Sequence, residues 1–276
     1  MAADETMSRI DRVFGDGSLI NETLRLAPRE AIARHQQSTQ PSAETMNVEL
    51  LLTDDDLSKE RTAQELVQWF EDRLSMINSC PAASRPALLH QRPFKKFYEE
   101  MYSFAHFVRH LYEGRQDVTC ELTPTITDRQ DYDAVVRDHS IAPPTTTYVQ
   151  LTTTTFDRDE SRRMQYFLKH GWVPAWGRIN AANEAELEVL SQEEKLQQTC
   201  QDIQKVVQRK SRFSYGADYA LIVSFDDFMW FGTEDDRAAL RSFVNDRLER
   251  WRLNVATLYV LGISGRTLLS FPASRP

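Results

Sequence analysis

The chain has 276 residues, of which 41% are hydrophobic, and a formal net charge of -8. This length suits one large domain, or one domain with an appendage, because a domain usually spans roughly 100–200 residues. No run of apolar residues approaches the ~18 that a membrane span needs, so we expect no membrane partner. The acidic balance argues against a surface that binds nucleic acid everywhere, but it leaves room for one local basic patch.

The amino-terminal residues and the cysteines indicate a cytoplasmic protein. The first residues, MAADETMSRIDRV, contain no apolar core of the kind found in secretory signals. Cys80, Cys120 and Cys200 are odd in number and far apart, which is typical of neither a disulfide framework nor a zinc site. We therefore expect reduced thiols in the cytoplasm.

Residues 1–93 predict an extension that is mostly helical, contains linkers and offers a surface for a protein partner. Linkers are expected at 36–46 and at 79–93, which holds three prolines, and a short strand at 48–52. A helix is expected over 58–78 because its apolar residues recur with helical spacing. These residues are Leu66, Phe70, Leu74 and Ile77.

Residues 94–276 predict an α/β domain with a mixed sheet flanked by helices. An amphipathic helix is expected over 94–113, where Gly114 ends it. Further helices are expected from Asp157 to Gly171 and over 183–210 and 234–251, with an aromatic loop at 171–180. Strands are expected at 118–123, in a hairpin spanning 131–152, and at 219–225, 256–263 and 267–271. Helices that alternate with strands in this way favour the α/β class.

The hairpin places polar residues on one side. If Asp133 pairs opposite Gln150, then Asp131 lies opposite Thr152 and Val135 opposite Tyr148, and side chains alternate between the two faces. One face then carries Asp131, Asp133, Gln150 and Thr152. The other carries Tyr132, Ala134, Val136, Val149 and Leu151. A slip of one residue would destroy the polar group, so the register is a sharp prediction.

This hairpin and the αβββαβ order over roughly residues 94–271 resemble the core of the PD-(D/E)XK restriction-endonuclease-like superfamily. The resemblance implies a divergent, Mg²⁺-dependent nuclease that acts on nucleic-acid phosphodiesters. It implies metal ligation by Asp133, by Gln150 and by the backbone of Leu151. Asp133 is preferred to Asp131 because it directly precedes the apolar run. Segment 156–177 also resembles a pattern in small bacterial proteins with nuclease-like cores, through Arg163-Met164 and Gly171-Trp172.

The chain departs from the family at two positions of the site. Gln150 stands where the family has a second acid and Thr152 where it has a lysine, so metal affinity and charge compensation are both reduced. Glu100 borders the buried side of its helix, and we expect it to supply a further catalytic carboxylate. For the absent cation and for nucleic-acid contact the candidates are Arg162, Arg163 and Lys169, with Lys205 and Lys210 as alternatives.

Two other interpretations remain open. Uncharged Gln150 and Thr152, with the acidic balance, favour a catalytically inactive nuclease-like fold that serves as a binding or regulatory module. A small-molecule enzyme on an unrelated α/β fold would instead place an apolar pocket near Trp172 and Trp176. Weaker signals are His106 and His110, whose helical spacing suits a metal, and Asp226-Asp227 after a buried strand. Each of these residues could also have a purely structural role, such as capping a strand or turn, lying on a solvated helix face or covering the edge of a core.

Overall fold

The computed structural model describes residues 51–124, 132–154, 158–173, 178–180, 182, 184–186, 190–228 and 231–272. The described helices are α4 (Asp54–Ser58), α5 (Ala63–Ser79), α6 (Pro81–Leu88), α7 (Phe94–Lys96), the π-helical turn η1 (Phe97–Met101), α8 (Tyr102–Tyr112), α9 (Arg158–His170), α10 (Gln192–Lys210) and α11 (Glu234–Trp251). The strands are β1 (Arg61–Thr62), β2 (Val118–Leu122), β3 (Ala134–Asp138), β4 (Thr145–Thr153), β5 (Arg178–Ile179), β6 (Ala185–Glu186), β7 (Tyr219–Phe225), β8 (Thr257–Gly262) and β9 (Leu268–Pro272).

Seven of these strands form one mixed sheet in the order β1-β2-β3-β4-β7-β8-β9. Strand β4 pairs parallel with β7 and β7 parallel with β8, and every other pair in the sheet is antiparallel. Strands β5 and β6 form a separate two-stranded pair. The expected α/β class with a mixed, helix-flanked sheet is confirmed.

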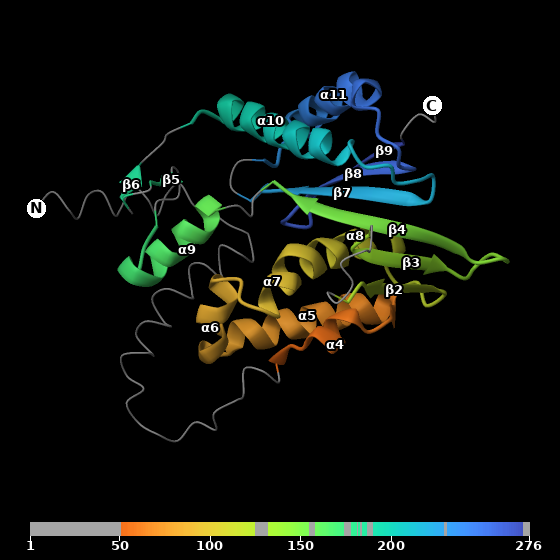
Figure 1. Ribbon diagram of the computed structural model, residues 1–276, viewed down its shortest axis with the longest axis horizontal. Coiled ribbons are helices and arrows are strands. Elements are labelled where there is room, and N and C mark those ends of the chain that lie inside the picture. Colours follow the sequence, from red (N-terminus) through yellow and green to blue (C-terminus); the bar gives the residue numbers. More distant parts are fainter. Residues whose placement is uncertain are drawn as a thin grey trace, which may run out of the picture. The chain divides into compact units, whose positions relative to one another are not determined.

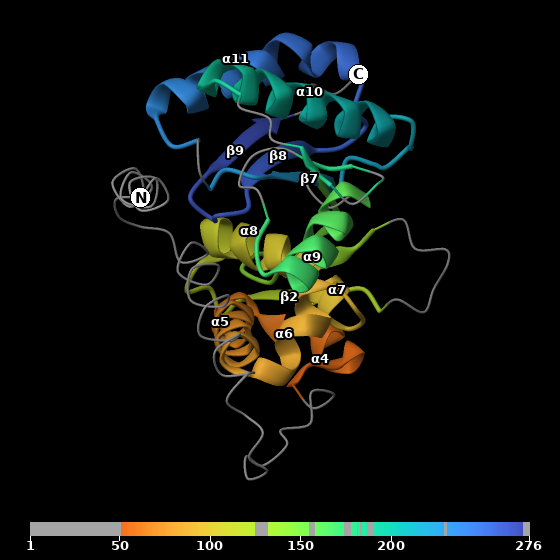
Figure 2. The same ribbon diagram turned by 90° about the vertical axis from the view of Figure 1, so that its left-hand side faces the viewer.

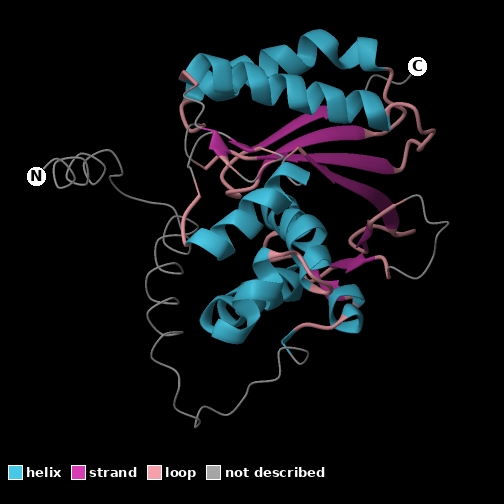
Figure 3. Cartoon of the chain, turned by 60° about the vertical axis from the view of Figure 1, so that its left-hand side comes forward, coloured by secondary structure: helices cyan, strands magenta, loops and turns pink. Residues whose placement is uncertain are grey.

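Helices cover both faces of the sheet, as Figure 1 shows from one side and Figure 2 after a quarter turn. Helices α10 and α11 lie over one face, and α5, α7 and α8 lie on the other; Figure 3 shows the strands between the two helical layers. The α8 side contains a core rich in aromatic residues, where Phe107 meets Tyr259 of β8 with ring centroids 5.0 Å apart. The α10–α11 side contains a second core built on the buried strand β7. Burial on both faces explains why β7 is an unbroken apolar run.

Most elements expected from Phe94 onward are confirmed; two of them differ, and so does the proline-rich stretch before Phe94. The 94–113 helix is one continuous helical stretch, but η1 inserts a π-helical turn near its start, directly after the three residues of α7. The helix expected over 183–210 begins at Gln192, because a reciprocal capping box between Ser191 and Glu194 satisfies its first amide groups. The proline-rich stretch expected as a linker contains helix α6, since Pro81 occupies the first helical turn, where its missing N–H costs nothing.

Residues 51–93 share a core with the rest of the described chain. Leu57 and Leu66 are fully buried in the same cluster as Phe97 and Val108, and the compact unit extends from Ser42 to Pro276. The boundary expected at residue 93 therefore falls within one core. The helices and the linker expected before residue 51 lie outside the described residues. Of the expected strand at 48–52, only Leu51 and Leu52 are described, and they are buried without forming a strand.

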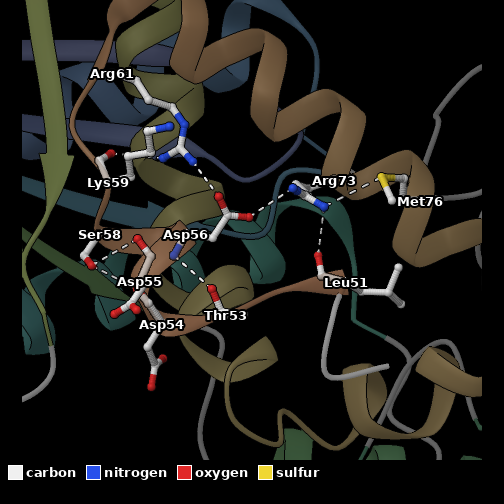
Figure 4. A network of polar contacts seen from close by, with 10 residues as sticks. All are labelled: Leu51, Thr53, Asp54, Asp55, Asp56, Ser58, Lys59, Arg61, Arg73 and Met76. Atoms are coloured by element: carbon white, nitrogen blue, oxygen red, sulfur yellow. Dashed lines mark hydrogen bonds and ion pairs between the residues drawn. The ribbon is translucent and has the colours of Figure 1, made fainter. Parts of the chain in front are cut away.

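A charged network holds the amino-terminal end of this core together (Figure 4). The Asp56 carboxylate bridges Arg61 at 2.8 Å and Arg73 at 3.1 Å, and so joins α4 to β1 and α5. Arg73 also donates to the carbonyl oxygen of Leu51 at 3.2 Å. The Arg61 guanidinium lies 4.1 Å from the ring centroid of Trp69, and its side chain is only 7% exposed. Burial lowers the pKa of Arg61, and the Asp56 carboxylate opposes that shift.

Replacement of Asp56 by alanine should lower the free energy of unfolding by about 2–4 kcal/mol, because it leaves the buried Arg61 guanidinium without its anionic partner. Chemical denaturation measures the change. Asp55→Ala is the matched control, since Asp55 is exposed in the same helical turn and should cost less than about 1 kcal/mol. Equal losses in the two variants would contradict a role for the bridge.

Candidate functional site

One edge of the sheet collects polar side chains. Strands β2, β4, β7 and β8 end at this edge, and the antiparallel β3 begins there. The residues at or just beyond these strand ends are Thr123, Asp133, Gln150, Thr152, Asp226 and Asp227. Carboxyl ends of parallel strands are a common place for function in α/β proteins, because loops there meet outside the sheet.

Asp133 directly precedes β3, at the point where the pairing of β3 with β4 ends. Val135 pairs with Tyr148 and Ala134 with Val149, which places Asp133 opposite Gln150 as expected. The Oδ2 atom of Asp133 accepts a hydrogen bond from the Leu151 amide at 2.7 Å and another from the Gln150 amide Nε2. The same Nε2 lies 3.4 Å from the Leu151 carbonyl oxygen. The structure thus brings together Asp133, Gln150 and the Leu151 backbone.

The face assignments of the hairpin are confirmed for the buried side. Ala134, Val136, Val149 and Leu151 all lie in the α8-side core. Tyr132 was wrongly assigned to that side, because its ring contacts Tyr148 at a centroid distance of 4.7 Å. The reason is that β3 begins only at Ala134, so strict alternation does not extend back to Tyr132. Asp131 lies outside the described residues.

Glu100 brings a second carboxylate to this edge from η1. It pairs with Lys96 one turn earlier, at 3.3 Å, and the Lys96 ammonium also donates to the Thr123 carbonyl. The Lys96 side chain is only 11% exposed. The neighbouring Glu99 points elsewhere and pairs with His90 at 3.3 Å. The π-helical turn therefore presents Glu100, and not Glu99, to the site.

The carboxylates and ammonium groups of the site influence one another. Burial raises the pKa of Asp133, and the Leu151 amide, Lys210 and Lys96 oppose the rise. Burial also raises the pKa of Glu100, Lys96 opposes that rise, and the charge of Asp133 adds to it. Burial lowers the pKa of Lys210, and Asp133 opposes the shift. Two carboxylates and two ammonium groups from four segments therefore form one charge-compensated group.

This group fits a hard divalent cation only with the help of neutral oxygen atoms. Across the described ranges, no cluster of three or more His, Cys, Asp or Glu side chains could hold a metal ion. Mg²⁺ needs few protein carboxylates because it usually keeps several waters. Asp133, Glu100 and the Leu151 carbonyl carry oxygen atoms of the kind that Mg²⁺ takes, and Gln150 would present its amide oxygen after a half-turn of the amide group. The Thr123 hydroxyl is buried beside them, with no hydrogen-bond partner in the described part of the chain.

The cations expected from α9 do not join Asp133. Burial raises the pKa of Asp226, and the charge of Arg163 is among the influences that oppose the rise, so Arg163 acts on a different carboxylate of the same edge. Arg162 lies half-buried on the same helix and Lys169 is exposed. Thr152 does not contact Asp133; its hydroxyl accepts a long hydrogen bond of 3.5 Å from Arg209.

Of the two alternative cations on α10, Lys210 is the one whose charge acts on Asp133. Lys205 pairs with Asp202 at 2.8 Å within the helix. Lys96, which acts on both Asp133 and Glu100, was missed by the sequence reasoning. A signal for it existed, because Lys96 stands four residues before Glu100 and so lies on the same side of the helix.

The remaining candidates do not form sites together. Trp172 is 52% exposed and packs edge-on against Tyr166 at 5.4 Å, whereas Trp176 lies outside the described residues. His106 is buried, and neither ring nitrogen has a partner in the described part of the chain. His110 instead lies 2.9 Å from the Gly265 carbonyl oxygen, so the pair does not converge on a metal.

Asp227 stabilises the turn between β8 and β9 at the far end of the same edge. It accepts from the Ser264 amide and from the Ser264 hydroxyl, both at 2.7 Å, and so clamps the turn between β8 and β9. A Cβ atom at Gly262 would lie 1.9 Å from Asp227 Oδ2, which requires glycine there. A Cβ atom at Gly265, whose φ is +71°, would lie 2.2 Å from the His106 ring. The turn thus closes against α8.

The sequence matches no protein-family model, and neither a curated protein nor a solved structure matches it. None of the described helices is long and apolar enough to cross a membrane.

Replacement of Lys96 by methionine should raise the pKa of Glu100 and of Asp133, because both carboxylates lose a nearby positive charge. Carboxyl-carbon chemical shifts followed through a pH titration report the change. Lys95→Met is the control, since Lys95 is 58% exposed and lies 4.0 Å from Glu99. If Lys95→Met moved the Glu100 titration as much as Lys96→Met did, Lys96 would not be the compensating cation.

His106 should make the protein less stable in mild acid. Burial lowers its pKa to about 4, from an unfolded value near 6.5, and Arg109 and His110 add to the shift. The unfolded chain therefore binds a proton first, so stability is full above pH ~6.5 and falls by up to about 3 kcal/mol towards pH ~4. His106→Gln should reduce the stability difference between pH 7.5 and pH 5 in chemical denaturation. His170→Gln, at an exposed position, should leave it unchanged.

Proposed function

We propose that this chain is a divergent member of the restriction-endonuclease-like superfamily and hydrolyses nucleic-acid phosphodiesters with Mg²⁺. The observation that carries the proposal is the meeting of Asp133 with the Leu151 backbone, where β3 and β4 separate. Glu100 and Lys96 reach the same place from the preceding helix. Carboxylate and carbonyl oxygens can hold the metal ion in metal-dependent phosphodiester hydrolysis, and a lysine can stabilise the negative charge that develops on the phosphate.

In this proposal the Mg²⁺ ligands are Asp133, Glu100, the Leu151 carbonyl and the Gln150 amide oxygen. The bound ion would polarise the phosphate and lower the pKa of a water molecule. Glu100 supplies the second acid that position 150 lacks, so the negative charge needed for Mg²⁺ comes from η1 in place of β4.

In this proposal Lys96 and Lys210 supply the positive charge of the family's lysine, at whose position this chain has Thr152. Both side chains act on the charge of Asp133, and Lys96 is held by Glu100 and the Thr123 carbonyl. A fixed ammonium group in a partly buried site stabilises the extra negative charge that a phosphodiester gains during hydrolysis. The proposed contacts to the nucleic-acid backbone are on α9, at Arg162, Arg163 and Lys169. The proposed location of the protein is the cytoplasm.

The same geometry favours a second candidate function. Asp133 Oδ2 already accepts two hydrogen bonds, and Lys96 pairs with Glu100, so these groups satisfy one another without an ion. A protein with such a site could use the fold as a catalytically inactive binding or regulatory module. The two candidates differ in whether a divalent cation displaces the Gln150 amide from Asp133.

Cleavage assays separate the two candidates. With Mg²⁺ or Mn²⁺, the protein should cut labelled DNA or RNA, EDTA should prevent cutting, and Asp133→Asn should reduce the rate by about 10²–10³-fold. Glu99→Gln is the matched control, because Glu99 lies in the same helical turn but pairs with His90, and it should change the rate by less than about two-fold.

Two outcomes would count against the proposal. Intact substrates with both ions, in single-stranded and duplex DNA and RNA, would favour the binding module. Cleavage by Asp133→Asn at the unmodified rate would place the activity elsewhere or in a contaminant.

A further inference from the structure

Five aromatic rings form a continuous row beside the candidate site. The centroids of Tyr132 and Tyr148 lie 4.7 Å apart, and those of Tyr148 and Tyr219 lie 5.2 Å apart. The row continues through Tyr215 at 5.6 Å and ends at Phe213 after a further 6.0 Å. It therefore runs from the start of β3, across β4 and β7, to the connection between α10 and β7.

The sheet sets the spacing of this row. Tyr148 and Tyr219 are direct partners in the parallel pairing of β4 with β7, and neighbouring strands lie about 4.7–4.9 Å apart. Successive rings are inclined by 32–45°, so no ring lies flat on the next. Side-by-side rings at this spacing leave aromatic surface that another planar group can contact.

Core packing explains part of the row but not its end. Tyr215 and Tyr219 pack against the α10–α11 core. Tyr132 and Tyr148 are half-buried at the sheet surface. Phe213, in contrast, is 57% exposed. The Phe213 end of the row is therefore open to another planar group.

The row leads into the group around Asp133. Tyr132 directly precedes Asp133 in the chain, and Tyr148 lies on the same side of β4 as Gln150 and Thr152 because side chains alternate. A polymer lying along the rings would therefore pass the carboxylate at its Tyr132 end.

Positive charge follows the row, although the whole chain carries -8. The last turn of α10 and the residues after it carry Arg209, Lys210 and Arg212. Arg209 donates to the Thr152 hydroxyl of β4 at 3.5 Å, and Lys210 acts on Asp133, so two of these cations act on residues of the candidate site. This local basic stretch complements a phosphate backbone.

We propose that the row Tyr132-Tyr148-Tyr219-Tyr215-Phe213 stacks the bases of single-stranded nucleic acid and guides the strand to Asp133. Unpaired bases have exposed faces that stack on aromatic side chains, whereas a duplex keeps its bases stacked inside. The cations at the end of α10 then face the phosphates. This inference rests on the proposed function, which it narrows from nucleic acid in general to single strands.

Binding without metal tests the inference separately from cleavage. Fluorescence anisotropy in EDTA would use labelled oligonucleotides of about 12 nucleotides, a length within the ~4–16 nucleotides that single-strand-binding OB-folds occupy. DNA and RNA single strands of equal sequence show which sugar is preferred, and the matching duplexes serve for comparison. We expect single strands to bind at least about ten-fold more tightly than duplexes, with affinity falling as salt increases.

Ring variants identify the surface. Phe213→Leu keeps an apolar side chain at an exposed position and should weaken single-strand binding on the order of ten-fold. Phe213→Tyr restores a ring and should recover the affinity lost in Phe213→Leu. Tyr148→Leu tests the middle of the row, with circular dichroism to verify that it folds.

The outcomes separate this inference from the proposed function. If the leucine variants bind as the unmodified protein does, or if duplexes bind as tightly as single strands, the inference is overturned even where cleavage persists. If single strands bind through the rings but are never cut with Mg²⁺ or Mn²⁺, the stacking surface stands and the proposed hydrolysis fails.

Discussion

The double pairing of β4 is the constraint on which the rest of the structure depends. This strand pairs antiparallel with β3 and parallel with β7, while Val149 and Leu151 are buried in the α8-side core. A slip of one residue would turn both apolar side chains out of that core, so burial fixes the register. The same register places Asp133 against the Leu151 amide and sets Tyr148 beside Tyr219. The site and the aromatic row therefore follow from one strand's packing.

Charge compensation is the second condition for this site. Isolated carboxylates are costly to bury, and burial raises the pKa of both Asp133 and Glu100. Lys96 and Lys210 reduce that cost from two separate helices. Lys96 is held in place by Glu100 and the Thr123 carbonyl, and both lysines bring positive charge to the carboxylate of Asp133. This balance is what makes both the hydrolytic and the binding proposals physically reasonable.

The polar edge of the sheet divides into two parts with different tasks. Around Asp133 the groups come from several elements and remain partly exposed. Around Asp227 both carboxylate oxygens are occupied by Ser264, and Gly262 and Gly265 allow the turn to pack closely. The pKa of Asp227 is also raised by burial, so a raised pKa by itself does not distinguish the two parts. The contacts distinguish them, because the part around Asp133 has the Leu151 carbonyl and a partly exposed aromatic row beside its carboxylates, whereas Ser264 occupies the carboxylate of Asp227.

The sequence by itself determined the elements and the register of the hairpin. Short apolar runs predicted β3 and β4, a longer apolar run predicted β7, and helical periodicity predicted the helix that contains α8, because all of these patterns depend on local geometry. Tertiary structure alone decided which charges reach Asp133. Lys96 and Lys169 stand at almost equal distances from Asp133 along the chain, yet it is Lys96, together with the more distant Lys210, whose charge acts on Asp133. Sequence spacing cannot show how helices pack on a sheet, since that depends on apolar contacts between distant segments.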